Sequence, residues 1–447
     1  MRSWQIRIFI ITWLGYAGFY LTRKAFSVAK NELKKPEVMG LSTETLSIID
    51  GGYLTAYACG QFFWGMLGDR LGTRAVVLTG MAVSIAVAVG MGLSAGPLAL
   101  GVLFTAQGLC QSSGWAPLTK NIGEFFTRGV RGRVMGLWCT NFAVGGMIAA
   151  VLAGLATRWG HVEVPLPAWL AAGGSLTLPD PWRMAFFVPA AVLGCIWLLF
   201  VVLQANRPED VGLPAAEAFT GEPEAVIDAG ETPADEPEGS WHTISEVFRS
   251  PMVLLMAFVY LFIKPLRYLL MFWGPVYLNE RLGTGTAESG ILGSLFDLAG
   301  PIGIFAGGFA TDILFNTRRM PMIAMTLAAG GLALALLPFV PATRLSLGLM
   351  LFVIGMLVYI PDSLASGVVA IDFGTKRGAS TAAGLINGCG SIGAIVGGTL
   401  PGFVKQISGS DATPWNAIFL TLAGGLVVAS LLVAPQWNRL PPAGRGR

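Results

Sequence analysis

The chain has 447 residues, of which 54% are hydrophobic and 12% are charged, and its formal net charge is +3. Soluble proteins carry about 25% charged residues, so the composition excludes a set of ordinary soluble domains, and the small, scattered net charge does not indicate nucleic-acid binding. Residues 75–119 contain no Asp, Glu, Lys or Arg. Because a helix needs about 20 apolar residues to cross a bilayer, the sequence predicts a membrane protein with many spans.

Twelve such spans are predicted along the chain. Pro and Gly mark tight turns between them, as at residues 94–97 and 341–343. The predicted fold class is therefore an all-α membrane protein with twelve transmembrane helices. The spans lie near residues 8–29, 45–67, 75–93, 98–120, 134–157, 184–205, 251–278, 287–311, 321–340, 345–367, 378–404 and 414–436.

One segment differs from the rest in composition. Residues 206–250, between the sixth and seventh spans, are rich in Pro, Gly, Ala and acidic side chains, and such a composition cannot build a hydrophobic core. It indicates either a flexible tether or a docking site for a partner. The predicted organisation is an N-terminal six-helix bundle at 1–205, a cytoplasmic acidic linker at 206–250, a C-terminal six-helix bundle at 251–437 and a cytoplasmic tail at 438–447.

Basic side chains predict the orientation of these spans. With both termini on one side of the membrane, that side collects 16 of the Lys and Arg residues, and the opposite side collects 8. Positive residues are enriched in cytoplasmic loops. Both termini are therefore expected in the cytoplasm, in a multi-pass protein of the cell membrane (inner or plasma membrane).

The sequence contains no motif for metal, cofactor or catalytic chemistry. Its five cysteines lie inside predicted spans without metal-ligand spacing, and its two histidines lie in predicted loops. It has no Gly-rich phosphate loop, zinc-binding His-Glu helix or nucleophile elbow. We therefore expect no cofactor, no metal site and no enzymatic activity.

The two halves of the chain repeat each other. Residues 65–74 follow the second span, and a weaker copy follows the eighth span, where Asp312 lies 243 residues after Asp69. Asn141 in the fifth span and Asn387 in the eleventh are 246 residues apart. A parallel duplication of this kind predicts a substrate site near the middle of the bilayer, between the two halves.

Residues 65–74 resemble the signature loop of the major facilitator superfamily, which implies two pseudo-symmetric bundles of six helices. Glycines in such a loop let two helices approach closely, and its arginines stay at the cytoplasmic face. We expect the loop to act as a conformational latch. The residues predicted to take part in gating are Gly65, Asp69, Arg70, Gly72, Arg74, Asp312 and Asp297.

Five basic residues fall within predicted spans, and two of them carry the main functional hypothesis. An arginine at a helix centre costs about 2.5–3.5 kcal/mol on insertion scales, so Arg23 and Arg267 require a reason. They are 244 residues apart, and the repeat predicts that they face each other. Two guanidinium forks suit a phosphate or carboxylate group. The alternative is internal pairing with intramembrane acids, namely Asp50, Asp297 or Asp362.

The basic residues also lie in motifs that resemble one family. Residues 16–24 (Tyr-Ala-Gly-Phe-Tyr-Leu-Thr-Arg-Lys) resemble the first-span motif of the organophosphate:phosphate antiporters, which include glycerol-3-phosphate, hexose-phosphate and sugar-phosphate transporters. Arg267-Tyr268 resembles the seventh-span motif, and further matches lie at 114–117, 294–297 and 390–393. The resemblance covers nearly the whole chain apart from 206–250. It implies that Arg23 and Arg267 bind a phosphoryl group.

Two departures from the family pattern concern the organic part of the substrate. Gln61 stands where the glycerol-3-phosphate transporter has a lysine, and Phe142 stands where it has a histidine, so a larger or differently charged ester is an open alternative to glycerol-3-phosphate. Beside the two arginines, the predicted substrate-binding residues are Lys24, Lys264, Tyr20, Tyr57, Gln61, Asn141, Tyr268, Tyr359 and Asn387.

These features predict a secondary transporter that exchanges a phosphate ester for inorganic phosphate by alternating access, as a functional monomer in the lipid bilayer. Phosphate between the two arginines neutralises their repulsion, so the occupied protein changes conformation more readily than the empty one. Two alternatives stay open. One is a transporter-like membrane sensor of hexose phosphate, and the other is a transporter of a different organic anion within the superfamily.

Overall fold

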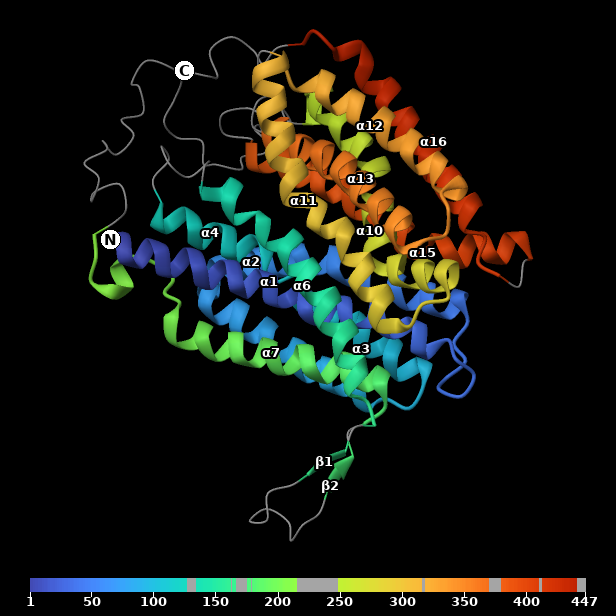
Figure 1. The fold of residues 1–447 in the computed structure, drawn as a ribbon. Coiled ribbons are helices and arrows are strands. Elements are labelled where there is room, and N and C mark those ends of the chain that lie inside the picture. Colours follow the sequence, from blue (N-terminus) through green and yellow to red (C-terminus); the bar gives the residue numbers. More distant parts are fainter. Residues whose placement is uncertain are drawn as a thin grey trace, which may run out of the picture. The chain divides into compact units, whose positions relative to one another are not determined.

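The computed structural model describes residues 1–126, 134–161, 163–165, 175–177, 179–214, 248–315, 318–369, 379–409 and 412–439. Within these residues the protein is almost entirely helical (Figure 1), which confirms the predicted all-α class. The described strands are β1 (Glu163–Pro165) and β2 (Ser175–Thr177), which form an antiparallel pair that the sequence did not predict.

The chain divides into two compact units, each described by itself. Unit 1 contains Met1–Thr220 and Met271–Ser294, and unit 2 contains Gly221–Leu270 and Leu295–Arg447. Two helices, α10 (Pro251–Leu282) and α11 (Thr286–Phe315), each contribute residues to both units. The bundle boundaries predicted from the sequence, at 1–205 and 251–437, stay predictions.

The other helices belong to one unit each. Unit 1 contains α1 (Arg2–Leu33), α2 (Thr43–Leu93), α3 (Pro97–Gln111), α4 (Trp115–Phe125), α6 (Thr140–Ala156), α7 (Pro181–Leu203) and the short turns η1 (Thr157–Trp159) and η2 (Glu209–Val211). Unit 2 contains α12 (Arg319–Leu336), η3 (Leu337–Phe339), α13 (Arg344–Ser363), the π-helix η4 (Leu364–Val369), α15 (Ala379–Ser408), α16 (Trp415–Val433) and η5 (Ala434–Gln436).

Eight helices in the described part of the chain are long and apolar enough to cross a membrane. They comprise Leu71–Leu93, Val134–Trp159, Pro181–Leu203, Pro251–Leu282, Thr286–Gly307, Arg319–Phe339, Arg344–Ser366 and Trp415–Gln436.

The turn predicted between the second and third spans is present as a break inside α2. Gly72 has φ +80° and ψ 158°, a backbone conformation that is essentially restricted to glycine. A Cβ atom on Gly72 would also lie 3.0 Å from the side-chain nitrogen of Asn206. The glycine therefore separates two helical segments, as its place in the signature loop predicts.

The prediction of one continuous helix at 98–120 was wrong, because this segment is divided into α3 and α4. The main-chain N–H groups of Ser113 and Gly114 donate to carbonyls three residues back, at Cys110 and Gln111. The hydroxyl of Ser112 donates to the carbonyl of Leu109 at 2.6 Å. Consecutive serines offer the backbone such alternatives to helical bonding, and the result is a turn at 112–114.

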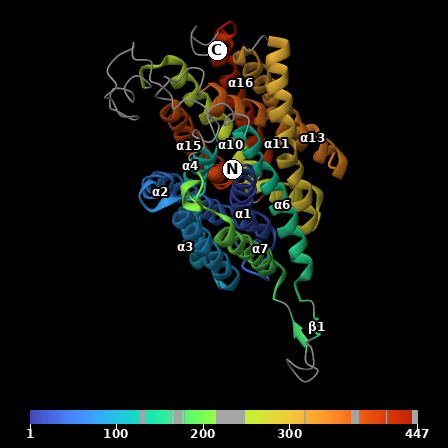
Figure 2. The ribbon, with the colours of Figure 1, turned by 90° about the vertical axis from the view of Figure 1, so that its left-hand side faces the viewer.

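Helix α1 packs against α4, α6 and α7 within unit 1 (Figures 1 and 2). Small residues permit this packing. A Cβ atom on Gly145 of α6 would lie 2.9 Å from Cα of Ala17 on α1. Between α2 and α3, a Cβ atom on Gly108 would lie 2.2 Å from the carbonyl oxygen of Tyr53. The close helices leave the middle of α1 buried on all sides.

Candidate functional site

Arg23 lies in this buried part of α1, and its side chain is 1% exposed. Its Nε donates a 3.1 Å hydrogen bond to Oε1 of Gln111 on α3. Its guanidinium carbon lies 4.3 Å from the ring centre of Tyr20 and 4.8 Å from that of Tyr57. Nη2 has no hydrogen-bond partner among the described residues. Arg23 is thus held by neutral groups, and the two N–H groups of Nη2 are available to an anion.

A network of polar side chains fixes the position of Gln111. Its Oε1 also accepts a 2.8 Å hydrogen bond from the hydroxyl of Tyr53 on α2. Its Nε2 donates to Oγ1 of Thr22, which also accepts from Nε2 of Gln107, each at 2.8 Å. Gln111 is the last residue of α3, directly before the serine turn. Gln111 was not among the residues predicted from the sequence, although two glutamines spaced four residues apart share one face of a helix.

The remaining predicted site residues of unit 1 lie in three helices. Lys24 is buried on α1, next to Arg23 along the chain, and Gln61 is half-buried on α2. Asn141 on α6 is fully buried, and neither atom of its amide group has a hydrogen-bond partner among the described residues. A buried amide without partners is costly, which marks Asn141 as a candidate for contact with a polar ligand.

Arg267 on α10 has an acidic partner. Its Nη1 donates a 2.7 Å hydrogen bond to Oδ2 of Asp362, and the side chains are 9% and 4% exposed, respectively. Oδ1 of the same carboxylate accepts a 2.9 Å hydrogen bond from the hydroxyl of Tyr260 and lies 3.4 Å from Nζ of Lys264. Asp362 therefore joins Lys264 and Arg267 of α10.

Tyr359 extends this group toward α11. Its ring centre lies 5.0 Å from the guanidinium carbon of Arg267, and its hydroxyl donates a 3.0 Å hydrogen bond to Oδ1 of Asp297. The ammonium group of Lys264 lies 5.8 Å from the ring centre of Tyr268. Asn387 is half-buried on α15. Within unit 2, the structure thus brings together five predicted site residues, Arg267, Lys264, Tyr268, Tyr359 and Asp297. It adds Tyr260 and joins them to Asp362, which the sequence had named as a possible acidic partner.

The internal pairing that the sequence left open is present for one arginine. Asp362 pairs with Arg267, whereas Asp50 pairs with Lys30, and Arg23 has no acidic partner among the described residues. Arg23 belongs to unit 1 and Arg267 to unit 2, so their predicted encounter at one phosphoryl group stays a prediction.

Lys30 and Asp50 lie in a second polar cluster of unit 1. Both side chains are fully buried. Lys30 also donates a 3.1 Å hydrogen bond to the carbonyl of Phe272, and its Nζ lies 4.0 Å from the ring centre of Trp273. This lysine therefore connects α1 with α2 and with the C-terminal part of α10.

A proline in α10 exposes a further acceptor to α1. Pro275 has no N–H, so the carbonyl of Met271 lacks its usual helical donor. Oγ of Ser27 donates to the carbonyls of Met271 and Phe272, each at 2.9 Å. Nδ2 of Asn31 donates a 3.2 Å bond to the carbonyl of Pro275. The side chains of α1 thus satisfy the irregular backbone of α10.

The signature loop is described in part. Arg74 donates from its main chain to Oδ1 of Asn206 at 2.7 Å, and its guanidinium donates to the carbonyls of Val201 and Gln204 at the end of α7. Gly72 makes the break described above. Gly65, Asp69 and Arg70 lie in α2 and Asp312 lies in α11, but their side chains are outside the described part.

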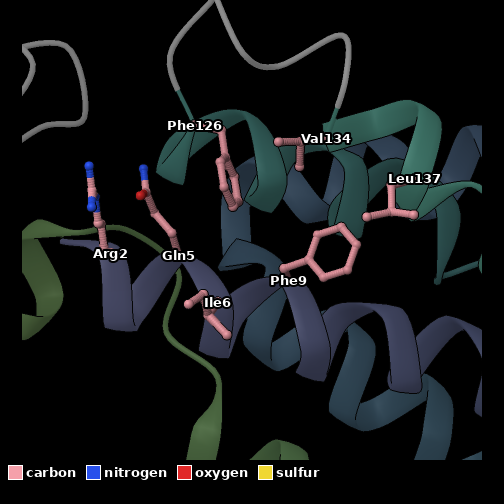
Figure 3. A pocket seen from close by; sticks show the side chains of 7 residues that line it. All are labelled: Arg2, Gln5, Ile6, Phe9, Phe126, Val134 and Leu137. Atoms are coloured by element: carbon pink, nitrogen blue, oxygen red, sulfur yellow. The ribbon is translucent and has the colours of Figure 1, made fainter.

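A pocket of about 350 Å³ lies near the start of α1, and Figure 3 shows the side chains that line it. Five of its seven lining side chains are apolar, which does not suit a phosphate ester, and it contains none of the predicted site residues. The residues that line the pocket are Arg2, Gln5, Ile6, Phe9, Phe126, Val134 and Leu137.

In the part of the chain that the structure describes, no group of three His, Cys, Asp or Glu residues is arranged to hold a metal ion.

Comparison with known proteins agrees with the resemblance seen in the sequence. Residues 8–398 match the Major Facilitator Superfamily. The glycerol-3-phosphate transporter of Bacillus subtilis (strain 168) is 28% identical over 441 residues, which cover 97% of this chain and 92% of that protein. The glucose-6-phosphate exchanger SLC37A2 of Homo sapiens is 28% identical over 493 residues, covering 95% and 90%.

Two solved structures share the fold. A bacterial homologue of the human lysosomal transporter Spinster has a TM-score of 0.70 at 15% identity, covering 98% of this chain and 96% of that chain. The nucleoside transporter NupG has a TM-score of 0.67 at 12% identity, covering 97% and 99%. At these identities the likeness concerns the fold alone.

Proposed function

Because the chain belongs to the Major Facilitator Superfamily, we propose that it is a secondary transporter that exchanges a phosphate ester for inorganic phosphate by alternating access. Its relatives are transporters and exchangers rather than enzymes. Relatives that are a glycerol-3-phosphate transporter and a glucose-6-phosphate exchanger support these two esters as members of the substrate class.

One observation carries the proposal. Arg23 is buried in the middle of a helix, and its described contacts are the amide oxygen of Gln111 and the rings of tyrosines. A buried cation held only by neutral groups is costly, and its unpartnered Nη2 is available to an anion. A phosphoryl group offers oxygen acceptors that suit the guanidinium fork.

We propose that Arg23 and Arg267 bind one phosphoryl group together, with Lys24 and Lys264 adding positive charge. The group at Arg23 contains Tyr20 and Tyr57, and the group at Arg267 contains Tyr359, so tyrosine side chains lie near both arginines. We propose that they contact the organic part of an ester. Repulsion between the two arginines is reduced in the empty protein, because Arg267 is paired with Asp362. The unneutralised charge that hinders the conformational change of the empty protein, and so favours exchange, is then mainly that of Arg23.

The finer architecture belongs to the same proposal. We propose twelve spans in two six-helix bundles, a cell-membrane location with both termini in the cytoplasm, and a functional monomer. The break at Gly72 and the hydrogen bonds of Arg74 to the end of α7 support a gating role for the signature loop, with Gly65, Asp69, Arg70, Asp312 and Asp297 as its further members.

Substrate counterflow in proteoliposomes tests the function. Vesicles loaded with unlabelled inorganic phosphate are expected to accumulate labelled phosphate, and external glycerol-3-phosphate or glucose-6-phosphate is expected to compete, while glycerol, glucose and sulfate are not. Binding of a phosphate ester without any counterflow would favour the membrane sensor. Counterflow of an organic anion that lacks phosphate, without counterflow of phosphate, would favour a different transporter of the superfamily.

A further inference from the structure

The internal repeat shows that the two arginines lie in different settings. Pro117 and Pro361 are 244 residues apart, the same separation as Arg23 and Arg267. The residue after Pro361 is Asp362, whereas the residue after Pro117 is Leu118, which is fully buried. One half of the duplication therefore carries a carboxylate at this position, and the other carries an apolar side chain.

Asp362 has donors on both of its oxygens. Oδ2 accepts from Arg267, and Oδ1 accepts from Tyr260 and faces Lys264. Because the carboxylate is almost completely buried and already has these partners, it is poorly placed to accept a further hydrogen bond from a substrate hydroxyl. It instead satisfies Arg267 in the way that a bound anion does.

A phosphoryl group and a carboxylate compete for the same donors. Both bind a guanidinium fork through paired oxygens, and two anions at one arginine repel each other strongly where water is excluded. A phosphate dianion that reaches Arg267 therefore has to separate this arginine from Asp362. Binding at Arg23 requires no such separation of an ion pair, since its oxygen partner is the neutral amide of Gln111.

The backbone around Asp362 is irregular on both sides. Pro361 lacks an N–H, so the carbonyl of Leu357 loses its helical donor. Two residues after Asp362 the chain enters the π-helix η4, and π-helical turns occur frequently at functional sites. Prolines and π-turns are common origins of helix kinks, so Asp362 lies where its helix can shift at low cost.

We infer that Asp362 is a resident counter-anion, which neutralises Arg267 and Lys264 in the empty protein and is displaced from Arg267 by the phosphoryl group of the substrate. This inference rests on the proposed function. The carboxylate lowers the affinity for phosphate compounds and promotes their release, because it takes back the arginine as the phosphoryl group leaves. Arg23 is the permanent anchor of the anion, and Asp362 is a positioning residue that acts through Arg267.

Titration calorimetry of inorganic phosphate into the full-length protein in detergent tests this role. Asp362→Asn preserves shape and removes the charge, and it is expected to lower the Kd for phosphate at least tenfold while slowing phosphate exchange in proteoliposomes. Asp50→Asn is the matched control, because it also neutralises a buried carboxylate that is paired with a cation. Its Kd is expected to stay within threefold of the wild-type value.

Unchanged or weaker phosphate binding by Asp362→Asn, or equal tightening by both variants, would overturn the inference. Asp362→Ser, which is also uncharged, provides the same measurement if the asparagine variant is not monodisperse. Measurements on the wild-type protein separate failure of the proposed function from failure of the role of Asp362. If it binds neither phosphate nor a phosphate ester, the proposed function itself is refuted, whereas wild-type binding without tightening by the variants refutes only the role of Asp362.

Discussion

Lys30 of α1 and Asp50 of α2 form an ion pair in which both side chains are fully buried. The aromatic ring of Trp273 and the carbonyl of Phe272 complete the surroundings of the lysine. Replacing a buried pair by apolar residues is often neutral, whereas removal of one partner leaves an uncompensated charge. The pair is therefore a test of how unit 1 is stabilised.

Lys30→Met alone is expected to destabilise the protein by about 3–5 kcal/mol, measured as a lower thermal unfolding midpoint in detergent. The double variant Lys30→Met with Asp50→Leu is expected to recover most of this loss. Lys34→Met is the control, because its pair with Glu280 is partly exposed and is worth about 0–1 kcal/mol. A double variant as unstable as the single one would contradict this account.

The carboxamide of Gln111 provides the second prediction. Gln111→Glu places a carboxylate on Arg23 and so gives unit 1 the pairing that Asp362 provides in unit 2. Phosphate affinity is expected to fall at least tenfold in titration calorimetry. Gln107→Glu makes the same change one helical turn earlier, where the amide bonds Thr22, and it is expected to have a smaller effect. Equal losses in the two variants would show that buried charge alone is responsible.

The third prediction concerns the break in α2. Gly72→Ala forces a Cβ atom into a backbone region that is essentially limited to glycine and against Asn206, and it is expected to cost about 1–3 kcal/mol. Thermal unfolding in detergent measures the loss. Gly96→Ala is the control, because Gly96 has φ −166° and a Cβ atom there would meet nothing within 4 Å. An equal loss of stability in both variants would contradict the claim that the backbone conformation at residue 72 requires glycine.

Much of the fold was predictable from the distribution of charge. Long apolar stretches without charged residues are expected to cross a bilayer as helices. The signature loop predicted at 65–74 contains the break that the structure places at Gly72. The division of α3 from α4 was not predictable in the same way. It depends on whether Ser112 and Ser113 bond their own backbone or a neighbouring helix, and composition does not decide between these options.

The site was predictable where burial of charge is costly. Arg23 and Arg267 were selected because a cation inside a span demands a reason. The pairing of Asp362 with Arg267, and of Asp50 with Lys30, depends on how each helix is rotated about its axis, which apolar sequences define poorly. Gln111 was missed because an uncharged amide in an apolar stretch carries only a weak signal.

The fourth prediction tests the chemistry of Arg23. Arg23→Lys keeps the charge but loses the planar guanidinium. In the wild-type protein, Nε of this group bonds Gln111 and its Nη2 is available to the anion. Phosphate counterflow in proteoliposomes is expected to disappear while membrane insertion and monodispersity are retained. Arg183→Lys, in which the replaced guanidinium bonds the carbonyl of Gly92, is expected to keep at least half of the wild-type rate. Counterflow at the wild-type rate by Arg23→Lys would exclude Arg23 from the site.

The proposal that Arg23 and Arg267 share one phosphoryl group is tested most directly by a double-mutant cycle. Inorganic phosphate is titrated into the wild-type protein, Arg23→Ala, Arg267→Ala and the double variant in detergent. If the two residues act as a unit, their losses do not add. Each single variant is then expected to lose most of the affinity, with the double variant scarcely weaker than the weaker single one. Additive losses would show two independent anion contacts and would contradict the shared site.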